Sequence, residues 1–283
     1  MLKMICFIIP TILFLAACAT SAPKPPTSEP PTPTPKPSPT PDGERVNWNL
    51  VWQDEFDGKT LDLHNWTFDL GANGWGNSEM EEYTDHTDNV RVENGNLIIE
   101  ARQDETAKYG FSSARIKTQD LQAWQYGRVE ARLKLPQGQG IWPAFWMLGS
   151  NISTTSIWPD CGEIDIMEFI GKEPNHIYNT VHGPGYSGAK GIGSHTELAQ
   201  GFLQNDFHVY AIEWEPTEIR WYIDDTQTFK VTANDTPGKW VFDHPFFIIL
   251  NLAVGGGWPG FPDSSTIFPQ QLLVDYIRVY QQP

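Results

Sequence analysis

Short runs of alternating apolar and polar residues, separated by Gly, Pro, Asn and Asp, recur from about residue 46 to the end of the chain. Because successive side chains of a strand point to opposite faces, this period of two predicts β-strands. In the clearest run, 127–135, we expect one set to face the core and the other to face outward: Val129, Ala131, Leu133 and Leu135 against Arg128, Glu130, Arg132 and Lys134. Further strands are predicted at 207–214, 219–223 and 246–254. No helix of useful length is indicated, so the domain is expected to be all-β.

The run 163–168 reads Glu-Ile-Asp-Ile-Met-Glu, so three carboxylates alternate with apolar side chains. Strict alternation places Glu163 and Asp165 on one face of a strand and Glu168 on the other, because five steps is an odd number. A β-bulge near Ile166-Met167, with Met167 as the inserted residue, would rotate Glu168 back to the first face. Bulges are frequent beside active sites, where they redirect a side chain. We therefore predict that the three acids form one cluster.

Three interpretations of such a cluster are open, because like charges placed together on a sheet are costly and need a reason. A solvated edge strand fits poorly, since Ile164, Ile166 and Phe169 make the opposite face look buried. An oxygen-lined calcium site also fits poorly, because three carboxylates in line along a strand do not wrap a 6–8-coordinate ion well. The spacing favours a catalytic acid pair.

The first 17 residues are typical of a signal peptide, with one basic side chain, Lys3, before an apolar run too short to cross a bilayer comfortably. The run ends Leu15-Ala-Ala-Cys18, which resembles a bacterial lipobox. We expect cleavage before Cys18, lipidation of that thiol, and an exported protein anchored to a bacterial membrane or cell surface. The alternative is cleavage at a small-residue site around Ala17-Cys18-Ala19, which would release a soluble protein.

Residues 18–45 are predicted to be a tether, because ten prolines lie between Pro23 and Pro41. Such a segment cannot bury apolar surface and stays extended as polyproline II. At ~3.1 Å per residue it would reach roughly 60 Å, enough to hold a domain away from a membrane. The remaining residues, 46–283, are of a size that a single β-sandwich domain can reach.

Composition narrows the partners of this domain. A net charge of −16 argues against nucleic acid, anionic membrane surfaces and sulfated polysaccharides, so membrane contact is expected only through the lipid at Cys18. All twelve tryptophans lie beyond residue 46, which is too many for one core unless a polar or sugar-facing surface uses some. Cys6 leaves with the leader and Cys18 would be lipidated, so Cys161 stays unpaired and is expected to pack at the start of its strand.

The heptapeptide 162–168, Gly-Glu-Ile-Asp-Ile-Met-Glu, resembles the signature of glycoside hydrolase family 16 in its laminarinase-like, bulge-containing form. Seven more motifs resemble the family in the expected order: Trp52-Gln-Asp-Glu-Phe-Asp57, Gly74-Trp-Gly-Asn-Ser-Glu79, Ser113-Ala-Arg-Ile-Lys117, Gly140-Ile-Trp-Pro-Ala-Phe-Trp146, Thr180-Val-His-Gly183, Asn251-Leu-Ala-Val-Gly-Gly-Gly-Trp-Pro-Gly260 and Val274-Asp-Tyr-Ile-Arg-Val-Tyr280. The resemblance covers the chain from about Asn47 onward. It implies a jelly-roll β-sandwich of two curved antiparallel sheets whose concave face forms a substrate cleft.

The resemblance assigns Glu163 as nucleophile and Glu168 as acid/base of a retaining glycosidase. Asp165 lies between them, where it would orient Glu163 and raise the pKa of Glu168 by like-charge repulsion. With the bulge, the two glutamates stand effectively four steps apart, about 13 Å between backbones at normal strand rise. Curvature of the sheet and inward-leaning side chains must close that gap.

Five side chains match sugar-contacting positions of the family: Asn77, Arg115, Trp142, Trp146 and Trp258. The tryptophans would stack on the apolar faces of sugar rings, while Asn77 and Arg115 would hydrogen-bond to hydroxyls. Core packing is the alternative for one tryptophan of the pair 142 and 146. His182 is expected on a neighbouring strand near Glu168 and joins the substrate-binding candidates, with a structural role as the alternative.

Members of the family often hold a structural calcium ion, and the resemblance implies a site at Glu55, Gly95 and Asp275. The alternation of residues 273–279 places Asp275 on the apparently buried face, where a carboxylate needs compensation. An arginine or backbone partner is the alternative. No cofactor is expected for catalysis.

The bulged signature and the tryptophan motifs look most like those of laminarinases. The resemblance therefore implies a monomeric endo-β-1,3-glucanase whose partner is β-glucan polysaccharide, with mixed β-1,3-1,4-glucan as a further substrate. Within the family the alternative is an agarase or carrageenase. Outside catalysis, the alternative is a β-glucan-binding protein, although relatives of that type lose the two glutamates.

Overall fold

A computed structural model describes residues 48–152 and 155–283 of the chain. The predicted leader, the lipidated Cys18 and the linker lie outside the described residues, so the predictions made for them stay predictions. None of the helices among the described residues is long and apolar enough to cross a membrane. The described part contains the predicted sandwich domain, 46–283, except residues 46, 47, 153 and 154.

Two sheets make up the domain, as the alternating pattern predicts. One is ten-stranded and contains β1 (Asn49–Asp54), β3 (Glu81–Tyr83), β4 (Val90–Glu93), β5 (Asn96–Gln103), β6 (Phe111–Ser113), β8 (Gly127–Lys134), β13 (His208–Glu215), β14 (Glu218–Ile223), β15 (Thr226–Thr232) and β17 (Gln270–Gln281). The other is seven-stranded and contains β2 (Thr67–Asp69), β7 (Arg115–Lys117), β9 (Ile141–Gly149), β10 (Glu163–Glu168), β11 (His176–His182), β12 (Ile192–Glu197) and β16 (Phe246–Val254).

Strand order follows a jelly-roll, with neighbours that are distant in the sequence. The ten-stranded sheet runs β15-β14-β13-β8-β17-β5-β6-β3, with β1 beside β17 and β4 beside β5, and the seven-stranded sheet runs β12-β11-β10-β9-β16-β7-β2. All pairs are antiparallel except β3 with β6. The helical content of the described residues is one turn each of α1 (Phe202–Asn205) and η1 (Gly188–Lys190), so the all-β prediction is confirmed.

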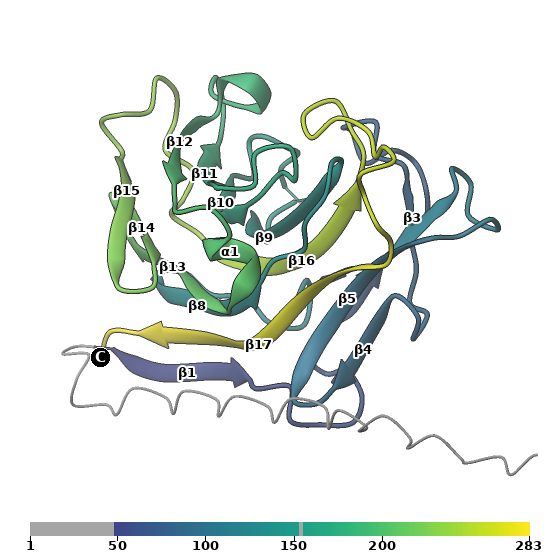
Figure 1. Cartoon of the computed structure of the whole chain (residues 1–283). Helices are drawn as coiled ribbons and strands as arrows, with labels where there is room; N and C mark the ends of the chain where they lie inside the picture. The colour runs from purple at the N-terminus through teal and green to yellow at the C-terminus, as the bar shows by residue number, and fades with distance from the viewer. Residues whose placement is uncertain (1–47, 153–154) are drawn as a thin grey trace, which may run out of the picture. The chain divides into compact units, whose positions relative to one another are not determined.

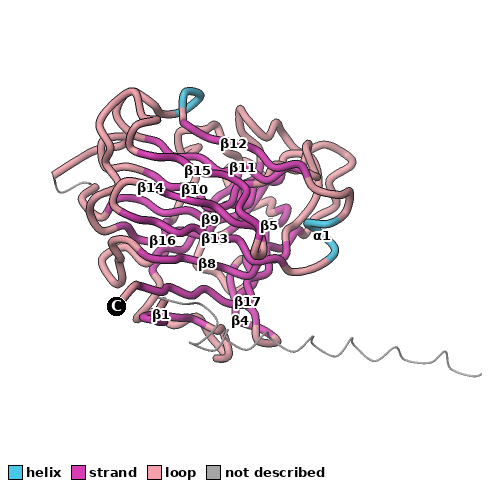
Figure 2. Tube along the Cα trace, turned by 90° about the vertical axis from the view of Figure 1, so that its left-hand side faces the viewer, coloured by secondary structure: helices cyan, strands magenta, loops and turns pink. Residues whose placement is uncertain are grey.

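The core lies between the sheets, where β9, β10 and β16 of one sheet lie over β8, β13 and β17 of the other (Figure 1). Figure 2, a view turned by 90°, shows the strands of both sheets crossing the domain. Strand β16 is buried along its whole length, because the core covers one of its faces and a smaller cluster with Cys161 and Leu148 packs against the other. The facing side chains of the main core include Val129, Ala131, Leu133, Ile212, Trp214 and Trp221 against Phe145, Met147, Ile164, Ile166, Ile248 and Leu250.

The four predicted strands are present, but their outward side chains are not all exposed. Residues Val129, Ala131 and Leu133 of β8 do face the core. Arg128 and Glu130 point the other way and are nevertheless buried. They pair with each other at 2.9 Å, the Arg128 guanidinium lies against the ring of Tyr222, and the Tyr280 hydroxyl donates to Glu130. Their predicted outward direction is confirmed, and they are buried because ion pairs on the outer face of a wide sheet can cover one another.

Asp275 is buried as predicted, at 3% exposed, but it does not share a face with Ile277 and Val279. The pairing of β17 with β8 shifts register between Val274 and Tyr276, which marks a bulge at Asp275. As a result Val274 and Ile277 both face the core, and Asp275 lies on the outer face against Arg132, at 2.7 Å. A bulge cannot be read from alternation alone, because it is what interrupts the alternation.

Candidate active site

The strand that carries the three acids is bulged where the sequence predicts. Against β9, Asp165 pairs with Trp146 and Met167 with Phe145, so Ile166 and Met167 share the space of one residue and the register shifts. Both are buried in the core. Glu163, Asp165 and Glu168 therefore share the opposite face. Their partners on β9 are Leu148, Trp146 and Ala144, which confirms the predicted separation of four steps between the two glutamates.

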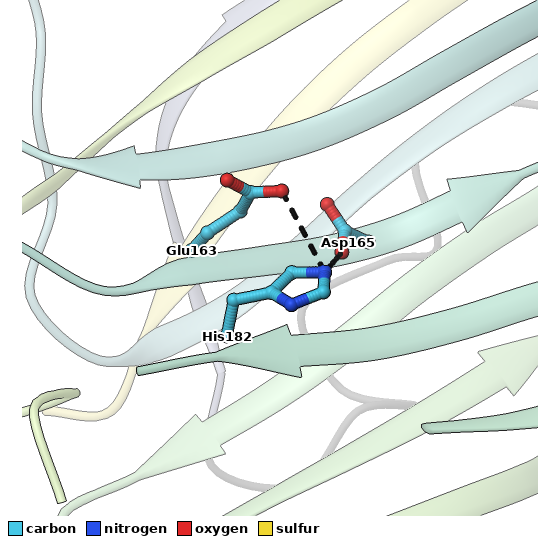
Figure 3. Close-up of side chains that lie close together, drawn as sticks. All are labelled: Glu163, Asp165 and His182. Carbon is cyan, nitrogen blue, oxygen red and sulfur yellow. Dashed lines mark ion pairs between the residues drawn. The ribbon is translucent and has the colours of Figure 1, made fainter. Parts of the chain in front are cut away.

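Glu163, Asp165 and His182 form a compact group on adjacent strands of the sheet (Figure 3). Their ligand-type atoms all lie within 4.8 Å of one another. The Nε2 atom of His182 is 3.2 Å from Asp165 Oδ2 and 3.9 Å from Glu163 Oε1. His182 pairs across the strands with Glu163, so the structure places it beside the predicted nucleophile rather than beside Glu168.

Burial raises the pKa of all three carboxyl groups, because a charged form is poorly solvated away from water. The pKa of Glu163 rises to about 8, with a further upward contribution from the charge of Asp165. The pKa of Asp165 rises to about 7 by burial, partly offset by a hydrogen bond with Glu163. The pKa of Glu168 is held well above its usual range by burial and by repulsion from both Asp165 and Glu163. Glu168 is repelled by both Asp165 and Glu163, whereas Glu163 is repelled mainly by Asp165. The protonated form is therefore favoured more strongly at Glu168 than at Glu163.

Two tryptophans orient the glutamates through their indole N–H groups. Trp158 Nε1 donates to Glu163 Oε2 at 2.7 Å, and Trp142 Nε1 donates to Glu168 Oε1 at 3.1 Å. A donor favours the charged form of the carboxylate that accepts it, so Trp158 lowers the pKa of Glu163 against the larger effect of burial. Sequence reasoning gave no such role to Trp158, because nothing local to its loop indicates that the loop folds over the end of β10.

A cleft runs over the three acids and consists of two adjoining cavities, of about 360 and 560 Å³, that share Asn77, Trp142 and Trp158 with the two glutamates. All six predicted substrate-binding side chains line it. Asn77, Arg115, Trp142 and Trp146 line the first cavity; Asn77, Trp142, His182 and Trp258 line the second. The second also contains side chains that sequence reasoning missed, among them Tyr178 and His195.

A chain of hydrogen bonds fixes the floor of the first cavity. Trp146 Nε1 donates to Asn251 Oδ1 at 2.8 Å, Asn251 Nδ2 donates to the Tyr83 hydroxyl at 3.2 Å, and that hydroxyl donates to Glu79 Oε2 at 3.2 Å. The Asn77 amide donates to the other oxygen of Glu79 at 2.8 Å. These contacts lock the Trp146 ring in the cleft wall. Asn251 was missed as a site residue because in the sequence it is one polar position within a buried strand.

Arg115 is held between two aromatic rings at the far end of this cavity. Its guanidinium carbon lies 4.8 Å from the ring centre of Trp146 and 5.0 Å from that of Trp75. Its Nε atom is 2.9 Å from Asp69 Oδ2, so one side of the guanidinium is occupied. The remaining N–H groups can donate to sugar hydroxyls in the cleft.

The loop that carries Trp258 depends on glycine. Gly255 and Gly256 have φ values of +74° and +130°, a region that side chains with a Cβ rarely adopt. The turn brings Trp258 to 5.3 Å from Trp142 and 4.9 Å from Tyr178, measured between ring centres. The positive φ values of the turn therefore explain why glycine occupies both positions.

Cys161 lies two residues before Glu163 and is fully buried beside Leu148, Phe247 and Ile249. Burial, with a smaller contribution from the charge of Glu163, raises the pKa of its thiol to about 11. The thiolate is the nucleophilic form, so this cysteine is inert at neutral pH. The packing role predicted from the sequence is the one the structure supports.

The side chains of the predicted calcium site have arginine partners. Both oxygens of Glu55 accept from Arg278, at 2.7 and 2.9 Å, and Asp275 accepts from Arg132 at 2.7 Å. Gly95 lies in the turn between β4 and β5 with φ of +73°. A calcium ion needs oxygen donors that are free to face it, and the carboxylate of Glu55 is already bound on both oxygens. These contacts favour the alternative given above, in which arginine side chains compensate the carboxylates. The calcium site stays a prediction.

Replacement of Glu163 by Gln should stabilise the folded protein. The folded pKa of about 8 exceeds the usual value of 4.5, so the unfolded state releases this proton first and stability falls as pH rises between these two values. Gln removes that loss, which at about 1.4 kcal/mol per pKa unit amounts to roughly 5 kcal/mol above the window. Calorimetric melting of Glu163→Gln and of wild type, at pH values below, within and above this range, measures the difference in their free energies of unfolding. A difference that stays constant with pH would contradict the burial argument, and Glu105→Gln, at an exposed position, is the control.

Known proteins resemble this chain over most of its length. A family model described as glycosyl hydrolases family 16 matches residues 77–278. A β-glucanase of Rhodothermus marinus is 44% identical, over 83% of this chain and 86% of the relative. A glucan endo-1,3-β-glucosidase A1 of Niallia circulans is 40% identical over 83% of this chain, which spans 38% of that longer relative. The solved laminarinase catalytic domain of Thermotoga maritima MSB8 is 48% identical with a TM-score of 0.79, covering 84% of this chain and 99% of that domain.

Proposed function

This chain belongs to family 16 of the glycosyl hydrolases, and on that basis we propose that it is an endo-β-1,3-glucanase that cleaves laminarin-type glucan with retention of configuration. The observation that carries the chemistry is the bulge in β10, which puts two glutamates and an aspartate on one face at the bottom of an aromatic cleft. The lipid anchor and the monomeric state stay predictions from the sequence.

In the first step Glu163 attacks the anomeric carbon while Glu168 acts as the acid. The carboxylate oxygen of Glu163 forms a bond to that carbon, the bond to the leaving sugar oxygen breaks, and the proton of Glu168 passes to the leaving oxygen. Burial, together with repulsion from the two other acids, keeps Glu168 protonated until this moment. Trp158 and His182 stabilise the charged form of Glu163.

In the second step water completes the hydrolysis. Glu168, now a carboxylate, takes a proton from a water molecule, whose oxygen attacks the anomeric carbon from the side that the leaving sugar has vacated. The ester bond to Glu163 breaks and the nucleophile is regenerated. Two inversions give net retention. Asp165 lies between the two glutamates on the strand, where its charge opposes ionisation of both and so couples their protons.

The cleft is suited to a neutral glucan. Tryptophan rings provide stacking surfaces for pyranose rings, while Asn77 and Arg115 offer hydrogen bonds to hydroxyls. Both glutamates are present, so a purely glucan-binding role leaves the cost of the acidic cluster unexplained. The net charge of −16 disfavours sulfated galactans such as carrageenan.

A substrate panel tests this function. Purified protein incubated with laminarin, lichenan, agarose and carrageenan should release reducing ends from laminarin first, with an early drop in viscosity that marks internal cleavage. Proton NMR of the first products should show the β-anomer before mutarotation. Release of ends from agarose or carrageenan but not from laminarin would reject the proposal, and activity on lichenan would extend it to mixed-linkage glucan.

A further inference from the structure

The bulge that brings Glu168 into the cleft leaves two backbone carbonyls to be satisfied by side chains. Trp221 Nε1 donates to the Asp165 carbonyl at 2.8 Å, and Asn179 Nδ2 donates to the Ile166 carbonyl at 2.8 Å. These are consecutive carbonyls at the point where the register of β10 shifts against both of its neighbours. A regular antiparallel ladder would have supplied backbone N–H groups instead.

Both donors are buried and come from two different strands. Trp221 is on β14 of the opposite sheet and is 0% exposed, and Asn179 is on β11, beside the bulge, and is 2% exposed. Trp221 therefore reaches across the core from one sheet to the other. Neither side chain lines the cleft, so neither can touch a sugar.

A second bulge lies behind these two residues. The pairing of β14 with β15 shifts register after Trp221, which leaves Thr228 as the extra residue of β15. The Thr228 hydroxyl is 3.4 Å from the Trp221 carbonyl and 3.5 Å from Asn179 Oδ1. Thr228 can thus donate to either of the two residues that hold the catalytic bulge, and it connects the bulge of β15 with the bulge of β10.

We infer that Trp221 and Asn179 are positioning residues for the reaction, because together they hold the β10 bulge and with it the direction of Glu168. The inference rests on the proposed function. Without a donor, a buried carbonyl is left unsatisfied at a cost in free energy, and that cost favours a more regular strand. Because a shift of one residue turns side chains to the other face, even partial relaxation moves Glu168 away from the leaving oxygen.

Trp221→Phe tests the inference by removing the indole N–H while keeping an aromatic ring in the core. For laminarin we expect kcat/KM to fall about 100-fold, the size of effect that a displacement of about 1 Å has on a reacting group, with KM little changed. The matched control is Trp214→Phe. Trp214 is also fully buried in this core and its Nε1 donates to a carbonyl, that of Phe242 at 3.0 Å, away from the bulge. The control should keep wild-type kcat/KM.

A second substrate separates misplacement of Glu168 from general damage. A 2,4-dinitrophenyl β-laminaribioside has a leaving group that departs without a proton, so its first step does not need the acid. Trp221→Phe should therefore retain near wild-type kcat/KM on the aryl substrate while losing it on laminarin. Equal losses on both substrates would mean that the core change damaged the site as a whole and would overturn the inference.

Asn179→Asp keeps the test decisive if Trp221→Phe does not fold. Its control is Asn89→Asp, because Asn89 is equally buried, donates to the Glu100 carbonyl at 3.0 Å and accepts from Thr84 at 2.7 Å, in a turn away from the cleft. For Asn179→Asp we expect the same fall in kcat/KM on laminarin as for Trp221→Phe, with near wild-type kcat/KM on the aryl substrate. Asn89→Asp should keep wild-type kcat/KM on both substrates. Wild-type activity of both positioning variants would reject the inference, whereas an inactive wild type would reject the proposed function itself.

Discussion

Replacement of Glu163 by alanine is expected to reduce laminarin hydrolysis by roughly 10⁵-fold, the order of loss that follows removal of a covalent nucleophile. The carboxylate is the group placed to attack the anomeric carbon, and the Trp158 indole and His182 act through it. Affinity should be little changed, because the sugar contacts are made by other cleft side chains. Reducing-end assays and calorimetric titration with a laminari-oligosaccharide measure the two quantities separately.

Rescue by azide tests whether the carboxylate that Glu163→Ala lacks is the nucleophile. With the 2,4-dinitrophenyl substrate, azide can enter the space left by the Glu163 side chain and attack the anomeric carbon, which gives the α-glycosyl azide. A β-azide would instead show that Glu163 is the acid/base and that the two roles are exchanged. Wild-type hydrolysis by Glu163→Ala, without any rescue, would exclude the mechanism altogether.

Replacement of Glu168 by glutamine is expected to lower kcat/KM on laminarin by about 10³-fold, within the usual range for a general acid. The amide cannot protonate the leaving sugar, although it can still accept from Trp142. The first step on the aryl substrate should be spared, since its leaving group needs no proton. Stopped-flow release of dinitrophenol followed by slow turnover would show that the second step has also lost its base.

The pH profile provides an independent readout of the same residue. Since its pKa lies well above the usual range for Glu, wild type should lose activity on laminarin at alkaline pH as Glu168 gives up its proton. That alkaline limb should be absent from the residual activity of Glu168→Gln. Glu81→Gln is the matched control, because the pKa of Glu81 is also raised well above its usual range by burial, yet its side chain does not line the cleft. An unchanged limb in Glu168→Gln would assign it to another group.

Much of the site was predictable because its signals are local. The acids lie within six residues of each other, and a two-residue period with one insertion suffices to put them on one face. The tryptophan and glycine motifs that predict a cleft are equally compact, and all six predicted substrate-binding side chains line it. Resemblance to a known family then added roles that spacing alone left open.

The features that alternation did not predict share one cause, which is pairing between distant parts of the chain. Arg128 and Glu130 alternate outward as predicted, but they are buried because strands that are far away in the sequence cover them. Asp275 lies on the outer face because β17 bulges where it pairs with β8. Alternation describes one strand, whereas burial and bulges depend on its neighbours.

The sequence by itself determined the all-β class, the trio Glu163, Asp165 and Glu168, and the insertion that unites them, because backbone geometry couples each side chain to its neighbours along one strand. Only the tertiary structure decided which groups surround that trio. Trp158 lies 5 residues before Glu163 and reaches it through a loop. Asn251, 86 residues after Asp165, is brought to the cleft by the pairing of β16 with β9, where it accepts from Trp146. Trp221, 56 residues after Asp165, contacts it because the two sheets pack together. Such contacts depend on the free energy of the whole folded core, and no local pattern encodes them.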